Sequence, residues 1–367
     1  MRFALDCRVV TAPKTGDRTY ALGLTRALAE LEPAHEYYFY AAEPTSLTEH
    51  PQTHCHAITL PASPRWTWTP IRFPLDLRRR GMDLAHVQYL VPPLTPCPIV
   101  TTIHDISFRR HPQLFPLKHR VLLNALIPSS IETARVVLTG SEATRRDLME
   151  LMGVPEHKIV VTPYAADASF VPMAPDLARA EVWKRFKISG RYVLSVAHIH
   201  PRKNLARLVR AWNRIAGRVQ QRLVLVGKRG WGNEDLNAAV ADADPRNPPI
   251  FTGYVADADL PVLYAGADAF AYPSLYEGFG LPPLEAMSCG TAVLTSNVSS
   301  LPEVVGSAGV LVDPTDVAEI SMGLWGLLED EAYRRRLGRA GLERARQFSW
   351  ERCARETVAA YEACFTV

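Results

Sequence analysis

Short apolar segments rich in β-branched and aromatic residues alternate with longer amphipathic segments along the chain. In the first half, the apolar segments have the composition of strands and lie at residues 3–10, 37–42, 55–60, 84–90, 98–103, 135–141 and 159–165. Amphipathic patterns such as residues 19–31 follow many of them. This alternation predicts a parallel sheet that is covered by helices.

The alternation is interrupted at residues 166–190, a segment that contains two prolines, and then begins again. Further strand candidates lie at residues 192–197, 222–227, 249–255, 269–274, 292–296 and 309–313. We therefore predict an α/β protein of two tandem Rossmann-like, doubly wound domains, at residues 1–175 and 176–345. The amphipathic helix within residues 346–367 is expected to pack back across the junction, because its apolar face must be buried. Ligands of such sheets bind at the carboxyl ends of the strands, so a site is expected in an inter-domain cleft.

Composition narrows the class of protein. The chain has 367 residues, of which 47% are hydrophobic and 22% charged, as in soluble globular proteins. A net charge of +3 is too small to indicate a nucleic-acid partner. No signal peptide or apolar run of transmembrane length is visible, and the six cysteines are scattered, so we expect reduced thiols and a cytoplasmic location.

Two cations follow the strand predicted at 192–197. Arg202 and Lys203 stand where an amphipathic helix begins, although a helix N-terminus ordinarily favours acidic side chains. A bound diphosphate would explain them, because helix amides and both cations would hold its negative charge together. The alternative is that both are solvated surface charges.

Two glutamates follow the strand predicted at 269–274. Glu277 and Glu285 flank a segment of glycines and prolines that opens a helix, and we place Glu285 in its first turn. Both carboxylates can accept hydrogen bonds from hydroxyl groups, while the amides between them meet phosphate or sugar oxygens. Alternatively, Glu285 only complements the helix dipole.

Two weaker candidates lie in the first half. Gly16, between the first strand and the first helix, would let the backbone approach a ligand closely. His104 lies just past the end of an apolar strand, at the edge where ligands bind, although a lone histidine is often structural. No G-x-G-x-x-G motif follows a strand, which disfavours a nicotinamide or flavin enzyme but not one that uses a sugar nucleotide.

Residues 61–130 are more basic than the rest, with nine Lys or Arg against three Asp or Glu. The segment 65–81 mixes Trp66, Trp68 and Phe73 with several arginines, and residues 108–127 repeat the mixture. Aromatic rings beside clustered cations suit an anionic membrane surface. The alternative is that the rings belong to the core and the arginines are solvated.

Together these motifs resemble the family 4 retaining glycosyltransferases of the GT-B fold. The resemblance rests on "EGFGLPPLE", "HPRKN", "IHDISF", "SEATRRDL" and "FSWE", and it spans nearly the whole chain. Within the family, the chain is similar to bacterial mannosyltransferases of surface-polysaccharide synthesis. The resemblance implies an N-terminal acceptor-binding domain, a C-terminal nucleotide-sugar-binding domain, and transfer of a hexose, with mannose favoured, to a glycan or lipid-linked acceptor.

The resemblance also assigns roles to the candidate residues. Glu277 would contact the donor sugar, and Glu285 would bind the ribose. Arg202 and Lys203 would hold the diphosphate in place of a metal ion, so neither a metal nor a cofactor is expected beyond the donor, for which GDP-mannose is favoured. The segment Gly278, Phe279, Gly280 and Leu281 would supply amides, Gly16 would face the diphosphate, and His104 would lie near the reacting sugar.

The chain departs from the commoner family pattern at His198, where many members have an arginine, so either His198 or Arg202 would contact the diphosphate. Two other functions stay open at this stage. One is a glycoside hydrolase that uses the two glutamates as paired carboxylates. The other is a sugar-nucleotide-binding protein without catalytic activity. If the acceptor is lipid-linked, we expect peripheral contact with the inner face of an anionic membrane.

Overall fold

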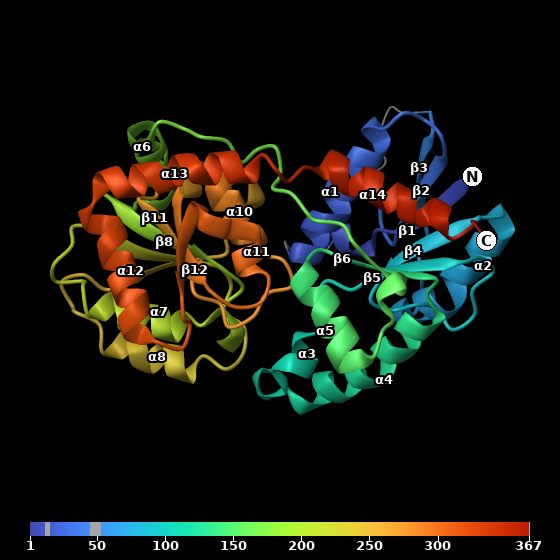
Figure 1. The fold of residues 1–367 in the computed structure, drawn as a ribbon, viewed down its shortest axis with the longest axis horizontal. Coiled ribbons are helices and arrows are strands. Elements are labelled where there is room, and N and C mark those ends of the chain that lie inside the picture. The colour runs from blue at the N-terminus through green and yellow to red at the C-terminus, as the bar shows by residue number, and fades with distance from the viewer. Residues whose placement is uncertain (12–14, 45–52, 367) are drawn as a thin grey trace. The chain divides into compact units, whose positions relative to one another are not determined.

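The computed structural model describes residues 1–11, 15–44 and 53–366, which form two compact units. Unit 1 comprises residues 1–165 and 349–367, and unit 2 comprises residues 166–348. The division predicted from the sequence stood at 175/176. Figure 1 shows the course of the chain through both units.

Unit 1 contains a parallel seven-stranded sheet in the order β3-β2-β1-β4-β5-β6-β7. Its strands are β1 (Arg2–Asp6), β2 (Glu36–Ala41), β3 (Cys55–Thr59), β4 (Leu84–Gln88), β5 (Ile99–Thr102), β6 (Val136–Thr139) and β7 (Ile159–Val161). Its helices are α1 (Gly16–Glu30), α2 (Phe73–Arg80), α3 (Ser107–Arg110), α4 (Leu117–Thr133), α5 (Glu142–Met152) and α14 (Trp350–Ala363).

Unit 2 contains a parallel six-stranded sheet in the order β10-β9-β8-β11-β12-β13. Its strands are β8 (Tyr192–Val196), β9 (Arg222–Val226), β10 (Ile250–Gly253), β11 (Ala269–Tyr272), β12 (Ala292–Ser296) and β13 (Gly309–Val312). Its helices are α6 (Pro175–Phe186), α7 (Leu205–Asn213), α8 (Glu234–Ala241), α9 (Leu260–Gly266), α10 (Leu281–Ser288), α11 (Leu301–Val305), α12 (Val317–Glu329) and α13 (Glu331–Ala345). The predicted class of two Rossmann-like α/β domains is therefore confirmed.

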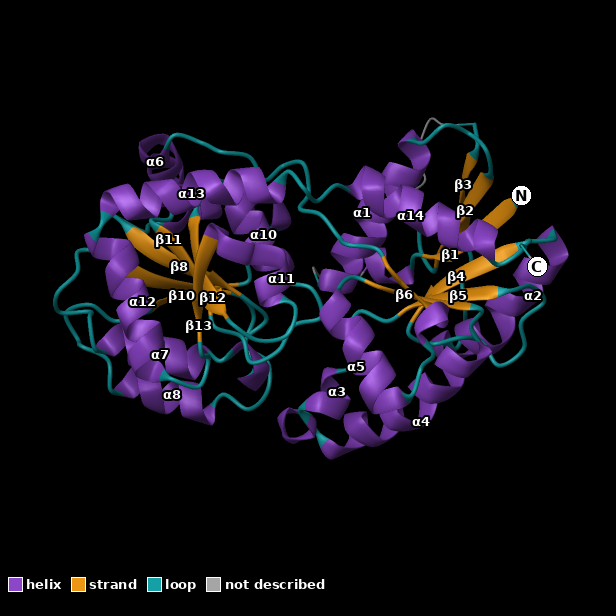
Figure 2. Cartoon of the chain, in the orientation of Figure 1, coloured by secondary structure: helices purple, strands orange, loops and turns teal. Residues whose placement is uncertain are grey.

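Helices cover both faces of the sheet in unit 2 (Figure 2). Helices α7, α8 and α12 pack on one face, where Trp212 and Leu324 join strand residues such as Val193 and Leu225 in one buried cluster. Helices α10 and α13 pack together on the other face. Inner strands such as β8 and β12 are nearly continuous apolar runs because they are buried on both faces.

The strand order of each sheet reverses beside the first strand of the unit. In unit 2 the chain moves outward from β8 through β9 to β10, then crosses back so that β11 pairs with β8. The loops after β8 and β11 consequently leave the same edge side by side. Such a reversal is where doubly wound sheets bind ligands.

The C-terminal helix α14 belongs to unit 1 and packs against α1, so the two ends of the sequence lie side by side (Figure 1). Gly23 of α1 makes room for the Trp350 indole, because a Cβ atom at Gly23 would lie 2.2 Å from that ring. The tryptophan of the "FSWE" segment therefore anchors α14 to α1.

The aromatic residues at 65–81 do not share one environment, which corrects their grouping as one surface patch. Trp68 and Phe73 are buried and stack on each other, with 4.5 Å between ring centroids. Trp66 is 72% exposed. In α2, Phe73 and Leu77 lie one turn apart and face the core, so Arg78, Arg79 and Arg80 are left exposed.

Candidate active site

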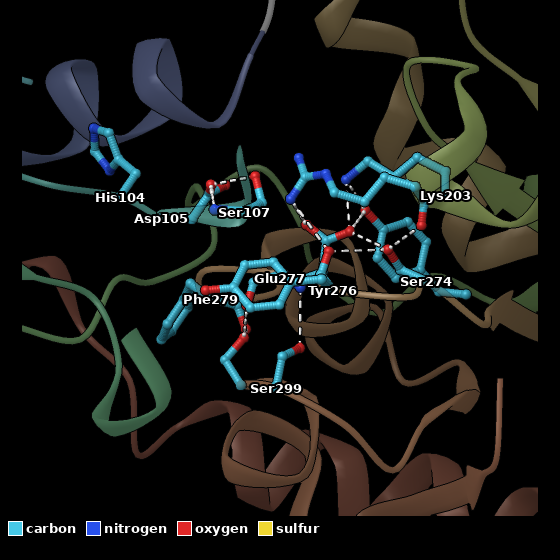
Figure 3. Close-up of polar contacts among 12 residues, drawn as sticks. His104, Asp105, Ser107, Lys203, Ser274, Tyr276, Glu277, Phe279 and Ser299 are labelled. Carbon is cyan, nitrogen blue, oxygen red and sulfur yellow. Dashed lines mark hydrogen bonds and ion pairs between the residues drawn. The ribbon is translucent and has the colours of Figure 1, made fainter. Parts of the chain in front are cut away.

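An ion cluster lies at the edge where β8 and β11 end (Figure 3). The ammonium Nζ of Lys203 donates to Oε1 of Glu277 at 2.6 Å and to the hydroxyl of Tyr272, also at 2.6 Å. The guanidinium of Arg202 lies 3.7 Å from Oε2 of Glu277 and donates to the carbonyl of Tyr276. The structure therefore brings together three of the residues that the sequence singled out.

The cluster is almost fully enclosed, and its two cations set the charge state of Glu277. Its side chain is 9% exposed, and those of Lys203 and Arg202 are 11% and 15% exposed. Burial alone would raise the pKa of Glu277, but Lys203 and Arg202 outweigh burial and lower the pKa to about 2. Glu277 is therefore a carboxylate at neutral pH, and two cations against one anion leave a net positive charge.

Serine side chains hold the loop that carries Glu277. Ser274 donates to Oε1 of Glu277 at 2.5 Å, and the Glu277 amide donates to Oγ of Ser299 at 3.0 Å. Ser300 donates to the carbonyls of Glu277 and Phe279. Ser299 has a φ of 54°, a left-handed conformation that is uncommon for serine and that tertiary contacts must maintain.

The segment 278–281 leads into α10. Gly280 has a φ of +115°, which favours glycine, and a Cβ atom there would lie 3.0 Å from Leu301. Pro282 and Pro283 occupy the first turn and have no amide hydrogen. The backbone amides at this helix end are therefore those of the residues before the prolines, the segment for which the sequence predicts contacts with phosphate and sugar oxygens.

Glu285 lies in α10 beyond the first turn, which contains no acidic residue, so the predicted position in that turn is wrong. The helix begins at Leu281, before the prolines, so Glu285 is its fifth residue and lies beyond the first turn. The residue is 3% exposed, and its Oε2 accepts a 2.8 Å hydrogen bond from the hydroxyl of Tyr264. Glu285 thus has a buried partner of its own and does more than complement the helix dipole.

Asn204, the last residue of the "HPRKN" segment, fixes the loop after β8. It has a φ of 59°, a left-handed conformation that asparagine tolerates better than most residues. Its amide donates to the carbonyls of Pro273 and Pro314, which follow β11 and β13. Asn204 therefore ties three loops together directly beside Lys203.

Two histidines precede the cations. His198 is exposed and His200 is half-buried, with 5.8 Å between their ring centroids. Burial, together with Lys203 and Arg202, lowers the pKa of His200 to about 3, and burial followed by Lys203 and Lys228 lowers that of His198. Both rings are therefore neutral at pH 7, so Arg202 and Lys203 carry the positive charge of this loop.

His104 and Gly16 belong to unit 1. His104 follows β5 and is 7% exposed. Both nitrogens of its ring are hydrogen-bonded: Nδ1 lies 2.7 Å from the Tyr164 hydroxyl, and Nε2 lies 2.8 Å from Oε1 of Gln88. Because Oε1 of Gln88 accepts, Nε2 carries the proton in this arrangement and Nδ1 accepts from Tyr164. Burial lowers the pKa of His104, although Asp17 and Asp105 oppose it, so the ring is neutral.

Gly16 begins α1, next to Asp17, whose Oδ1 lies 3.9 Å from Nε2 of His104. Among the described residues, and apart from the chain neighbours of Gly16 and the backbone of its own helix, no heavy atom lies within 4 Å of the position that a Cβ atom of Gly16 would take. The backbone at Gly16 is thus open, and packing does not require glycine there. Pro13 and Lys14, which precede it in the predicted loop, lie outside the described residues.

Sequence reasoning did not identify several residues that shape the site. Ser299 and Ser300 follow β12, Tyr272 ends β11, and Gln88 ends β4. Ser299 and Ser300 could have been predicted from the "SNVSS" segment, because polar residues at the carboxyl end of a parallel strand lie at the ligand-binding edge. Tyr272 and Gln88 are also polar residues at the ends of strands, but each stands alone there, so nothing in the sequence distinguishes it from other strand ends.

Two family models match the chain. Residues 15–170 match Glycosyltransferase Family 4, and residues 183–344 match Glycosyl transferases group 1. The chain is 39% identical over 266 residues to O-antigen chain mannosyltransferase B of Escherichia coli, which covers 72% of this chain and 70% of that protein. It is 33% identical to the serotype-specific mannosyltransferase WbdA of Escherichia coli over 62% of this chain, but the match spans only 28% of WbdA.

Solved structures share the fold across the whole chain. Sucrose-phosphate synthase from Thermosynechococcus elongatus has a TM-score of 0.80 at 23% identity and covers 100% of this chain and 99% of its own. Anabaena HepE in complex with UDP-glucose has a TM-score of 0.74 at 18% identity, over 99% of this chain and 100% of its own. The similarity in sequence and the two parallel-sheet units lead to the same conclusion: the chain belongs to glycosyltransferase family 4, with the GT-B fold.

Proposed function

We propose that this glycosyltransferase transfers mannose from GDP-mannose to a hydroxyl group of a glycan or lipid-linked acceptor, with retention of configuration. The names of its relatives favour mannose and a polysaccharide acceptor. The observation that carries the proposal is the enclosed cluster of Arg202, Lys203 and Glu277 at the edge where β8 and β11 end.

In this proposal Arg202 and Lys203 hold the diphosphate. When the bond between the sugar and the diphosphate breaks, negative charge develops on the departing phosphate, and two fixed cations in an enclosed site stabilise it strongly. The two cations take the place that a divalent metal ion has in other transferases. Activity is therefore expected to persist in EDTA.

Glu277 would accept a hydrogen bond from a hydroxyl group of the donor sugar, and Glu285 would accept one from the ribose. Gly16 would approach the diphosphate, and His104 would lie near the reacting sugar. No carboxylate has to act as a covalent nucleophile, because the acceptor can attack from the same face that the nucleotide leaves. The hydroxyl proton then passes to the departing phosphate, which becomes a better base as it leaves.

The pKa of Glu277 argues against its use as the acid of a glycoside hydrolase. Such an enzyme needs a carboxylic acid whose pKa is raised, so that it can protonate the leaving oxygen. The pKa of Glu277 is lowered to about 2, and Lys203 occupies its Oε1. Glu277 therefore cannot supply a proton near neutral pH.

The test is incubation of the protein with GDP-mannose, UDP-glucose and related donors, together with candidate lipid-linked acceptors. We expect nucleotide release that depends on the acceptor, and a product whose anomeric configuration by NMR is that of the donor. Absence of release with every donor would contradict the proposal. Binding of a nucleotide sugar without turnover in the presence of the true acceptor would support a non-catalytic binder instead.

We also infer peripheral contact with an anionic membrane through α4 and α2 of unit 1. Helix α4 exposes an apolar stripe of Leu117, Val121, Leu122 and Leu126, which are 64%, 60%, 52% and 40% exposed. Lys118 and His119 are exposed beside it, and α2 exposes Arg78, Arg79 and Arg80. An apolar stripe with adjacent cations is typical of helices that lie at a bilayer surface. Within the described residues, no helix is both long and apolar enough to span a bilayer.

The vesicle experiment that tests this contact changes Arg78, Arg79 and Arg80 together to Ser. We expect salt-sensitive sedimentation with anionic vesicles, reduced in this variant, because each nearby cation gains about 1 kcal/mol from anionic lipid. A matched control changes Arg335, Arg336 and Arg339, exposed residues of α13, to Ser. Equal sedimentation with neutral and anionic vesicles, unaffected by the α2 change, would disprove the contact.

A further inference from the structure

Phe348 is the last residue of unit 2, and the proposed mechanism does not use it. Its ring meets the ring of Phe279 edge to face, with 5.8 Å between the centroids and an interplanar angle of 79°. Phe279 is 5% exposed and lies in the loop that carries Glu277 (Figure 3). Edge-to-face aromatic pairs contribute more than their buried area alone. Phe348 therefore packs directly against the loop of the candidate donor site.

Arg344, near the end of α13, joins Phe348 to the end of α11. Its guanidinium lies over the Phe348 ring, with 5.1 Å between the central carbon atom and the ring centroid. Its Nε donates to the carbonyl of Val304 at 3.0 Å, and its Nη2 donates to the carbonyl of Glu303 at 2.6 Å. Both carbonyls belong to the last turn of α11, where an α-helix supplies no donors of its own. Arg344 therefore caps α11 and holds Phe348 at the same time.

The start of α11 holds the same loop. Ser300, which directly precedes α11, donates to the carbonyls of Glu277 and Phe279 at 3.0 Å and 2.6 Å. The loop is thus attached to the start of α11 through its backbone and to the end of α11 through Phe348 and Arg344. These contacts form a closed circuit, so the loop cannot shift without breaking one of them. Removing Phe348 or Arg344 opens the circuit and leaves the backbone attachment alone.

Building on the proposed function, we propose that Arg344 and Phe348 are positioning residues for sugar transfer. Neither touches the donor or the reacting atoms. Through Phe279 they hold the loop so that Glu277 meets the donor sugar, and a small displacement of such a group slows a reaction strongly. The diphosphate is held by the cations after β8, outside this circuit. Arg344 and Phe348 therefore act on turnover and have little effect on the affinity for the nucleotide.

The test measures turnover of the full-length protein with the nucleotide sugar and lipid-linked acceptor on which the wild type is most active, and GDP binding by isothermal titration calorimetry. For Phe348→Ala we expect kcat to fall about tenfold or more while the Kd of GDP stays within about threefold. Arg344→Lys keeps the charge but loses the planar guanidinium that contacts α11 and Phe348 together, so it should lower kcat in the same way. Phe348→Tyr keeps the ring and should restore most of the turnover.

Two matched controls should behave as the wild type does. Phe186→Ala removes a half-buried phenylalanine at the end of α6, and Arg346→Lys changes an exposed arginine just after α13.

A double-mutant cycle separates a positioning role from a loss of stability. Phe279→Leu removes the ring that Phe348 contacts, keeps an apolar side chain, and should itself lower kcat. If Phe348 acts through Phe279, adding Phe348→Ala to Phe279→Leu should change kcat by no more than about twofold. A change that only lowers stability would act equally in both backgrounds. Should Phe348→Ala not fold, the same cycle is run with Phe348→Leu.

The proposal is overturned by a wild-type kcat in either Phe348→Ala or Arg344→Lys. It is also overturned by additive effects of the Phe279 and Phe348 changes, or by an equal loss of kcat and of GDP affinity. A wild type that transfers no sugar from any donor would overturn the proposed function itself. Failure of the positioning proposal alone leaves wild-type transfer intact, so the two failures are distinguishable.

Discussion

Lys203 illustrates how neighbouring residues fix a single charged side chain in this protein. Its ammonium already has an anionic partner, Glu277, and a neutral one, the hydroxyl of Tyr272. These contacts hold the cation in place, so in the proposed complex little side-chain entropy would be lost on binding a diphosphate. His104 is positioned in the same way, between Tyr164 and Gln88.

We predict that Lys203→Ala weakens GDP binding by about 1–3 kcal/mol, because one charged hydrogen bond to the diphosphate is lost. Isothermal titration calorimetry measures this loss directly. Lys184→Ala removes an exposed lysine of α6 and is the control. GDP affinity equal to that of the wild type in Lys203→Ala would show that this cation does not hold the diphosphate.

Glu277→Ala should lower kcat far more than it weakens GDP binding, because the proposed partner of Glu277 is the donor sugar and not the nucleotide. Steady-state kinetics with GDP-mannose, combined with calorimetry of GDP, separate the two effects. Transfer at the wild-type rate would remove Glu277 from the donor-sugar site.

Glu277 also makes stability depend on pH. Its pKa is lowered from 4.5 to about 2 in the folded protein, so the stabilising contribution is fully present above about pH 4.5 and is lost as the pH falls towards 2. A shift of this size corresponds to about 3 kcal/mol. We expect the wild type to be more stable than Glu277→Gln at pH 7, and the difference to shrink below pH 4.5 in denaturant unfolding. A difference that does not vary with pH would contradict the charged pairing.

At the scale of elements, apolar periodicity was sufficient to predict the strands of both units, because a parallel strand buried on both faces is a continuous apolar run. The meeting of Lys203 and Glu277 was predictable for a related reason, since both follow strands whose carboxyl ends share one edge. Partners chosen by packing were not predictable. Tyr264 reaches Glu285 from a neighbouring helix, and Trp68 is buried although its sequence neighbour Trp66 is 72% exposed.

The contact between α1 and α14 gives a prediction at this scale. Gly23→Ala would place a methyl group 2.2 Å from the Trp350 ring, so α14 must shift. Overpacking of this kind costs about 1–3 kcal/mol. We expect a lower Tm in a thermal unfolding experiment. Gly326→Ala in α12 is the control, because outside its own helix no heavy atom of the described residues lies within 4 Å of the added methyl group. It should leave the Tm equal or slightly higher. An unchanged Tm in Gly23→Ala would show that α14 is not anchored through Trp350.

At the scale of the whole molecule, each unit carries its candidate residues at the carboxyl edge of its own sheet. Unit 2 holds the ion cluster and Glu285, and unit 1 holds Gly16 and His104. Unit 1 also bears the exposed apolar stripe of α4. In the roles that we propose, unit 2 binds the nucleotide and unit 1 binds the acceptor, while Gly16 and His104 of unit 1 would also meet the donor.

The most direct test of the central claim is one assay of the wild type and Lys203→Ala with GDP-mannose and a lipid-linked acceptor, in which GDP release and mannose incorporation are both measured. We predict equal amounts of GDP and incorporated mannose for the wild type, with both rates strongly reduced in Lys203→Ala. Transfer by Lys203→Ala at the wild-type rate would contradict the role of the ion cluster, and GDP release without mannose incorporation would contradict sugar transfer to the acceptor.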